Sequence, residues 1–216
     1  MDLRRTVAVL AVVIATVTAG CGFLTGQNAL EFGASPATAS ENARAETGYE
    51  ETNVTASVAT RNFSVAGQTR QVEVTNQRAK YERAVDLGPL GSQRAAVFVT
   101  FASPEVKVAT ETFNPISDMS EREILAQFES QYDGVSVGQQ VDARNVSTLG
   151  RSTRLKKFEG TATLAGTEVD VYVHAAKFKH EGDYVVAVGI YPQRLSSEDE
   201  HVATLVRGLE HDGGES

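Results

Sequence analysis

The single cysteine of this chain, Cys21, carries the best-defined chemistry in the sequence. It directly follows Thr18-Ala19-Gly20, small residues that a signal peptidase can bind in an extended conformation. A cysteine thiolate is nucleophilic enough to accept a lipid as a thioether. We therefore predict cleavage before Cys21 and lipidation of its sulfur. The alternative is an unmodified cysteine behind an ordinary signal.

The residues ahead of Cys21 have the order of an export signal. Arg4-Arg5 opens it and resembles a twin-arginine motif, and residues 7–17 are almost entirely apolar. This stretch is about half of the ~20 residues that a membrane-spanning helix needs, so a cleaved signal over residues 1–20 is the better interpretation. Residues 21–36 then form a lipid-anchored tether, broken by glycine, serine and proline. The expected location is extracytoplasmic, at the cell membrane.

Three asparagines begin Asn-x-Ser/Thr motifs, namely Asn53, Asn62 and Asn145. In an exported chain such motifs are acceptors for N-linked glycans. Because the motif fixes only two positions, chance occurrence in a sequence rich in serine and threonine is the competing explanation.

His174, His180, Glu181 and Asp183 are the candidates for a metal site, since imidazole and carboxylate groups are common metal ligands. Their spacing lacks the pair of histidines four residues apart on a helix that would favour such a site. A structural or solvated role is the preferred interpretation, so the sequence predicts no metal and no catalytic residue.

Gly134-Val135-Ser136-Val137-Gly138 matches the nucleophile elbow of hydrolases by residue type. That motif requires a strand before the serine and a helix after it. Here a helical pattern comes first and no helical pattern follows, so a short edge strand is expected. The sequence also lacks a phosphate loop, a Ser-x-x-Lys motif and a dinucleotide fingerprint, and no cofactor is expected.

The formal net charge is -8, and arginine (14 residues) outnumbers lysine (6 residues). Surface carboxylates keep a protein hydrated and dispersed, and this composition suits a high-salt cell. The negative charge argues against nucleic acid as a partner, because phosphates would be repelled.

From residue 51 the pattern is that of strands. Val54, Ala56 and Val58 alternate with more polar neighbours, which predicts a strand with one buried face. Residues 95–101 and 184–190 are continuous apolar runs and predict central strands covered on both faces. Two Ser-x-x-Glu boxes, starting at Ser120 and Ser197, each open an apolar helical pattern.

These elements predict an α+β fold in which an antiparallel sheet of about six strands is packed by two main helices. Residues 37–216 would form this single domain. Each half runs through strands, an Ala-Gly turn, an apolar strand and a capped helix, which suggests two similar βββα halves. The alternative is that antiparallel hairpins resemble one another by default.

Five segments resemble a family of haloarchaeal surface lipoproteins of unknown function: EETNVT (50–55), AVDLGPLG (84–91), FNP (113–115), EVDVYVH (168–174) and DYVVAVGIYP (183–192). The resemblance covers most of the expected mature chain and implies no activity and no catalytic residue. The order of strands and helices is more loosely similar to PsbP-like domains, which implies a fold only.

Together these features favour a non-catalytic binding module, held at the membrane by the lipid on Cys21 and binding an envelope protein or a small ligand. Two alternatives stay open. One is an extracytoplasmic enzyme with an unrecognised site around His174, His180, Glu181 and Asp183. The other is an accessory subunit of a membrane complex.

Overall fold

The computed structural model describes residues 29–65, 68–86, 88, 91–108, 111–114, 116–129 and 134–214. The predicted signal and Cys21 lie outside these residues. The chain divides into a smaller unit, Met1–Glu31 with Thr60–Glu73, and a larger unit, Phe32–Ala59 with Val74–Ser216. Most of the residues discussed below belong to the larger unit, whereas Thr60, Arg61 and Asn62 of β3 belong to the smaller one.

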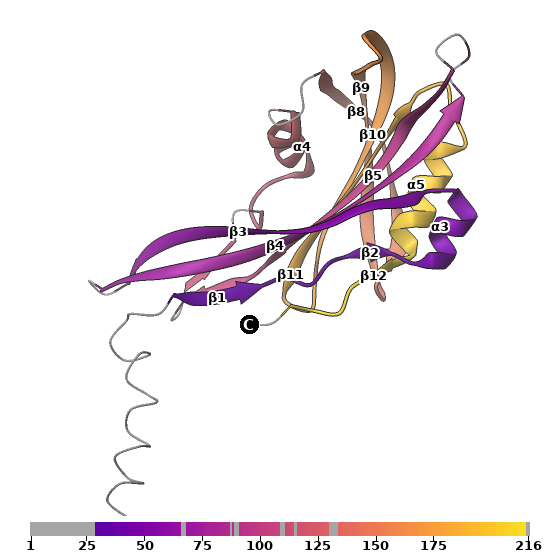
Figure 1. The fold of residues 1–216 in the computed structure, drawn as a ribbon. Helices are drawn as coiled ribbons and strands as arrows, with labels where there is room; N and C mark the ends of the chain where they lie inside the picture. The colour runs from indigo at the N-terminus through magenta and orange to yellow at the C-terminus, as the bar shows by residue number, and fades with distance from the viewer. Residues whose placement is uncertain are drawn as a thin grey trace, which may run out of the picture. The chain divides into compact units, whose positions relative to one another are not determined.

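Within the described ranges, eight strands form the main sheet (Figure 1). Seven follow the order β1-β4-β5-β11-β10-β9-β8, and β3 pairs with β4. The strands are β1 (Leu30–Gly33), β3 (Glu50–Val65), β4 (Gln68–Asp86), β5 (Ser92–Pro104), β8 (Val135–Thr148), β9 (Arg151–Leu164), β10 (Thr167–His180) and β11 (Asp183–Pro192).

Four short strands form two further pairs, β2 (Thr38–Ala39) with β12 (Leu209–Glu210) and β6 (Val106–Val108) with β7 (Glu111–Phe113). The helices of the described residues are α3 (Glu41–Thr47), α4 (Glu121–Glu129) and α5 (Glu198–Arg207). All three are short, so their stability depends on packing rather than on helix propensity.

The structure confirms that the two apolar runs, residues 95–101 and 184–190, lie in central strands of the sheet. They belong to β5 and β11, which pair antiparallel with Val185 opposite Ala102 and Ile190 opposite Val97. Successive side chains of a strand point to opposite faces. In β11, Val185 and Ala187 therefore join one buried cluster, and Val186 and Val188 join the other.

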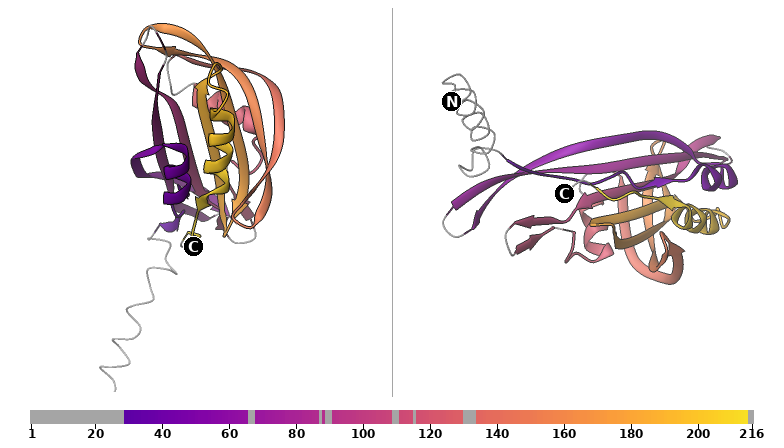
Figure 2. Two further views of the ribbon diagram at one scale, coloured as in Figure 1. Left: turned by 90° about the vertical axis from the view of Figure 1, so that its right-hand side faces the viewer. Right: turned by 90° about the horizontal axis from the view of Figure 1, so that it is seen from below.

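The helices cover both faces of this centre, as Figure 2 shows. Val202 and Leu205 of α5 pack in the same cluster as Val185, whereas Leu125 of α4 packs in the cluster of Val186. A Cβ atom on Gly189 would lie 2.6 Å from a methyl carbon of Val202, so this glycine permits the close approach of α5.

The prediction of about six strands packed by two main helices is wrong. The described chain is dominated by its eight-stranded sheet, and three short helices accompany it. The prediction left out β1 and expected only a short edge strand where β8 runs for 14 residues. β1 has only four residues and lies in the segment assigned to the tether, and β8 lies in a glycine-rich segment whose local pattern is weak.

The prediction of two similar βββα halves is also wrong. β3-β4-β5 and β9-β10-β11 are both consecutive neighbours, as the prediction requires. If the two halves were related by symmetry, a twofold rotation would exchange the antiparallel strands β5 and β11. Its axis would be perpendicular to the sheet, so it would not exchange the two faces of the sheet. It would place α4 and α5 on one face, but they pack on opposite faces.

The two predicted capping boxes have different outcomes. At α4, the Ser120 N–H donates to the Glu123 carboxylate at 2.7 Å, and the Ser120 hydroxyl accepts from the Glu123 N–H at 3.3 Å. That box is confirmed. At α5, Ser197 makes no capping hydrogen bond with its side chain, and Glu200 is instead paired with arginines.

Candidate functional site

The three sequon asparagines, Asn53, Asn62 and Asn145, are all exposed, the first two on β3 and the third on β8. Ser136 of the Gly-x-Ser-x-Gly motif lies within β8 and pairs with Thr161 of β9. The serine therefore occupies an edge strand, as predicted, and not a strand-to-helix turn.

The turn between β10 and β11 brings together two of the predicted residues and one that sequence reasoning missed. His180 and Asp183 are paired across the hairpin, and His211, which follows β12, packs against both. The Nδ1 atoms of His180 and His211 are 3.0 Å apart, and His211 Nε2 lies 3.1 Å from Asp183 Oδ2. No local pattern in the sequence could have indicated His211. It follows α5 in the chain, and only the tertiary fold brings it next to His180 and Asp183.

This arrangement specifies where protons sit. The carboxylate of Asp183 also accepts the Ser35 N–H at 3.1 Å and is 2% exposed. In the tautomer in which a neutral His211 donates to Asp183 through Nε2, its Nδ1 accepts the Nδ1 proton of His180. The Nε2 lone pair of His180 is then the end of a hydrogen-bonded chain, which is an orientation suited to accepting a proton.

A hollow of about 300 Å³ lies beside this turn. It is lined by Phe32, Gly33, Pro104, Glu105, Lys107, Glu181, Gly182, Asp183 and Gly214. Lys179 and Lys107 pair with Glu105, and the hydrogen bond from Lys179 is the main cause that lowers the pKa of Glu105. Asp183 lines the hollow, but the two histidines are not among its lining residues.

His174 does not join this cluster. It lies opposite Gly189 in the β10–β11 ladder, and its Nε2 is 2.9 Å from the Tyr191 hydroxyl and 3.1 Å from Asp199 Oδ1. Burial is the main cause that lowers the pKa of His174, so we assign a neutral ring with its proton on Nε2, where both neighbours can accept it. Its Nδ1 is buried without a hydrogen-bond partner.

Asp199 connects α5 to β8 and β9. Its carboxylate lies 2.9 Å from Lys157 Nζ and 3.5 Å from Arg144 Nη2. The hydrogen bond from His174 and the ion pair with Lys157 hold the pKa of Asp199 well below its usual range. Because His174 is neutral in our assignment, we attribute the electrostatic part of this effect to Lys157.

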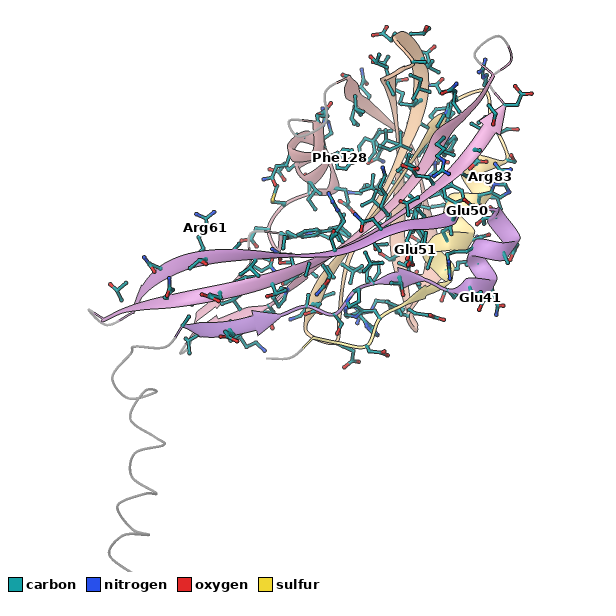
Figure 3. All side chains as sticks on the ribbon, viewed as in Figure 1. Glu41, Glu50, Glu51, Arg61, Arg83 and Phe128 are labelled. Carbon is teal, nitrogen blue, oxygen red and sulfur yellow. The ribbon has the colours of Figure 1, made fainter. Side chains whose placement is uncertain are left out.

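Glu198, the preceding residue, connects α5 to the other side of the sheet. Its side chain is fully buried, accepts the Tyr49 hydroxyl at 2.8 Å and is paired with Arg83 of β4. Figure 3 shows Arg83 beside α5. Burial, reinforced by the charge of Glu198, raises the pKa of Tyr49 well above its ordinary value. Glu198 thus links the start of α5 to β4, and Asp199 links it to β8 and β9 at the other end of the strand order.

Among the described residues, no three His, Cys, Asp or Glu side chains form a group that could hold a metal ion. His174, His180, Glu181 and Asp183 are therefore not assembled into one site. None of the helices in the described ranges has the length and apolar character needed to cross a bilayer.

The most unusual surface is the apolar face of β3. Val54 and Val58 are 40% and 63% exposed, and Ala56 between them is also exposed. The alternation that predicted a buried face is present, but in this structure that face meets solvent. From Thr52 to Thr60 no residue is charged, and in the part of the chain that the structure describes β4 is the only strand paired with β3.

The outer strand β8, at the far end of the strand order, is built differently. Its pairing with β9 shifts register on both sides of Gln140. Arg122 of α4 donates to the Val137 carbonyl at 2.8 Å, and Glu129 of α4 accepts the Val137 N–H. Register shifts, charged residues and side chains that occupy backbone groups are the usual protections of a sheet edge.

The structure is that of a mostly-sheet protein, in which three short helices accompany an eight-stranded sheet among the described residues. A family model, described as a domain of unknown function (DUF6517), matches residues 36–210. The chain belongs to this family. No curated protein matches it.

Proposed function

We propose that this protein is a non-catalytic binding module, tethered outside the cell by a lipid on Cys21, which binds a partner through the apolar face of β3. The exposed Val54, Ala56 and Val58 carry the proposal. An exposed outer strand with unpaired backbone groups can be extended by a strand of another protein, the mode called β-augmentation. Long edges of this kind are otherwise avoided in natural proteins.

The sequon at Asn53 is compatible with this role. Asn53 and Val54 are neighbours in one strand, so their side chains point to opposite faces. A glycan on Asn53 would project from the polar face and leave the valines accessible.

Photocrosslinking in intact cells tests the binding role. A photoreactive residue at Val58 is expected to give a defined crosslinked product. The same residue at Val141 of β8, which is 50% exposed, is the matched control and is expected to give none. Equal labelling from both positions, or none from either, would contradict the proposal.

The N-terminal pattern supports the location. A basic start, an apolar stretch and the small residues before Cys21 are typical of a lipoprotein signal. The similarity to haloarchaeal surface lipoproteins and the acidic, lysine-poor composition point to a high-salt archaeal cell. Mass spectrometry of the mature N-terminus should detect a lipid on Cys21, whereas a chain beginning at Met1 with a free thiol would disprove the anchor.

A second candidate function is an extracytoplasmic enzyme, favoured by the hollow at the β10–β11 turn and the Asp183–His211–His180 chain beside it. His180 would act as a base oriented by His211. Hydrolysis of ester, phosphoester or glycoside substrates by the full chain, lost in His211→Gln, would support this function. Equal rates for the two proteins would exclude it.

A further inference from the structure

β3 contains two pairs of residues that are symmetric about the same position. Val54 and Val58 lie at equal distances on either side of Ala56. If two copies of β3 pair antiparallel with Ala56 opposite Ala56, Val54 of each copy faces Val58 of the other. Directly opposed side chains of an antiparallel pair lie on the same face and contact one another. This register therefore brings each exposed valine into lateral contact with a valine of the other copy.

The charged residues of β3 select the same register. Glu51 and Arg61 are also equidistant from Ala56, and both are exposed. The register that pairs the valines consequently places a carboxylate opposite a guanidinium at each end of the paired segment. Parallel pairing would instead set Glu51 beside Glu51 and Arg61 beside Arg61, and like charges directly opposite one another are destabilising.

The faces are consistent with this pairing. Thr52, Val54, Ala56, Val58 and Thr60 share one face of β3, and every one of them is exposed. Two such strands side by side would form one continuous apolar strip flanked by threonines. The opposite face carries Asn53, Thr55 and Ser57 together with Ala59, and is mainly polar.

We propose that the occupant of the β3 edge is a second copy of this chain, paired antiparallel through β3 and centred on Ala56. The interface is isologous, because the same strand contributes both sides. The proposal rests on the proposed function in one respect only, namely that β3 is a binding edge.

Disulfide trapping of the full chain tests the register. In Ala56→Cys the two introduced thiols face each other, with Cα atoms about 4.5–5.5 Å apart, a separation that a disulfide can bridge. In Ala59→Cys, the matched control on the same strand, the two thiols are separated by about 20 Å. A disulfide-linked dimer of Ala56→Cys, with none of Ala59→Cys, is the expected result. A dimer of Ala59→Cys, or of neither variant, would overturn the proposal.

Two substitutions test the apolar contact. Val58→Lys places a cation opposite Val54 of the other copy and should weaken self-association of the full chain by ~tenfold or more, measured by sedimentation. Val141→Lys makes the same change at an exposed valine of β8 and should leave self-association unchanged. Equal effects of the two variants, or no effect of Val58→Lys, would refute the interface.

A charge exchange tests the ends. In a dimer of Glu51→Arg, each introduced arginine faces Arg61 of the other copy. In a dimer of Arg61→Glu, each introduced glutamate faces Glu51. Each variant should therefore self-associate several-fold more weakly than the unchanged chain at low salt. A mixture of the two variants restores opposite charges at both ends, and the mixed dimer should form preferentially. Random mixing would show that Glu51 and Arg61 do not face each other.

The photocrosslinked product from Val58 separates the two proposals. Mass corresponding to two copies of this chain supports both. A product with a different protein would uphold the binding role of β3 and overturn self-pairing. The absence of any product would overturn both.

Discussion

β3 and β8 are the outer strands on the two sides of the sheet, and each exposes a valine to solvent. Their surroundings differ. β8 has register shifts, charged residues such as Asp142 and Arg144, and backbone groups occupied by α4. β3 carries no charged residue from Thr52 to Thr60. The same molecule thus protects one edge and leaves the other open, and this difference is the basis of the proposed binding role of β3.

The contrast extends to the helix between the two sides. Glu198 of α5 holds the β3 side through Tyr49, the residue before β3, and through Arg83. Glu200 holds β8 through Arg144. The side chain of Glu198 is fully buried and that of its partner Arg83 is 30% exposed, whereas the side chain of Glu200 is 59% exposed. The fold is therefore expected to depend far more on the link at the open edge than on the link at the protected one.

Glu198→Ala should have the largest effect. It leaves the Tyr49 hydroxyl and the Arg83 guanidinium without their buried acceptor, and removing one partner of a buried pair costs about 3–5 kcal/mol. Denaturant unfolding should show this loss of free energy. A loss below about 1 kcal/mol would mean that water replaces the carboxylate and that the link is not essential.

Gly160→Val should disturb the protected edge. Gly160 lies in β9 opposite Val137, and a Cβ atom there would collide with the Ser136 carbonyl of β8. Forcing a side chain into such a contact typically costs about 1–3 kcal/mol. Gly166→Ala, at a turn where a Cβ has open space, controls for the loss of glycine itself, although its positive φ adds a smaller strain. Equal stability of the two variants would show that β8 can move away from β9.

The link to β8 should also depend on pH through His174. Burial lowers the pKa of His174 in the folded state, so the unfolded chain binds the proton first as pH falls below about 6.5. Stability should therefore decrease from pH 7 to pH 5, by at most about 1.4 kcal/mol per pH unit from this residue. His174→Gln should show a shallower decrease in denaturant midpoints. An unchanged slope would mean that other groups cause it.

Glu200→Ala should have the smallest effect. Its ion pairs with Arg144 and Arg207 are exposed, and such pairs contribute about 0–1 kcal/mol and weaken with salt. The same denaturant series at low and high salt checks this expectation. A loss comparable to that of Glu198→Ala would remove the difference between the two links.

Several elements could be predicted correctly from interactions between residues close together in the chain. The continuous apolar runs identified β5 and β11 as central, because only doubly covered strands dispense with alternation. The Ser120–Glu123 box and the Ala165-Gly166 turn are local interactions, and both are present as predicted. The box at Ser197 failed because tertiary partners, Arg144 and Arg207, compete for Glu200.

By itself, the amino-acid sequence determined which segments are strands with an apolar face, where two of the helices begin, and the lipoprotein-like N-terminus from which an anchor is predicted. Those properties depend on residues close together in the chain. Only the tertiary structure decided that α4 and α5 cover opposite faces, that His211 joins Asp183 and that the apolar face of β3 stays uncovered. Each of these features depends on contacts between segments far apart in the chain. The alternation of side chains along a strand predicts that one face is apolar, but it does not predict which segment will cover that face.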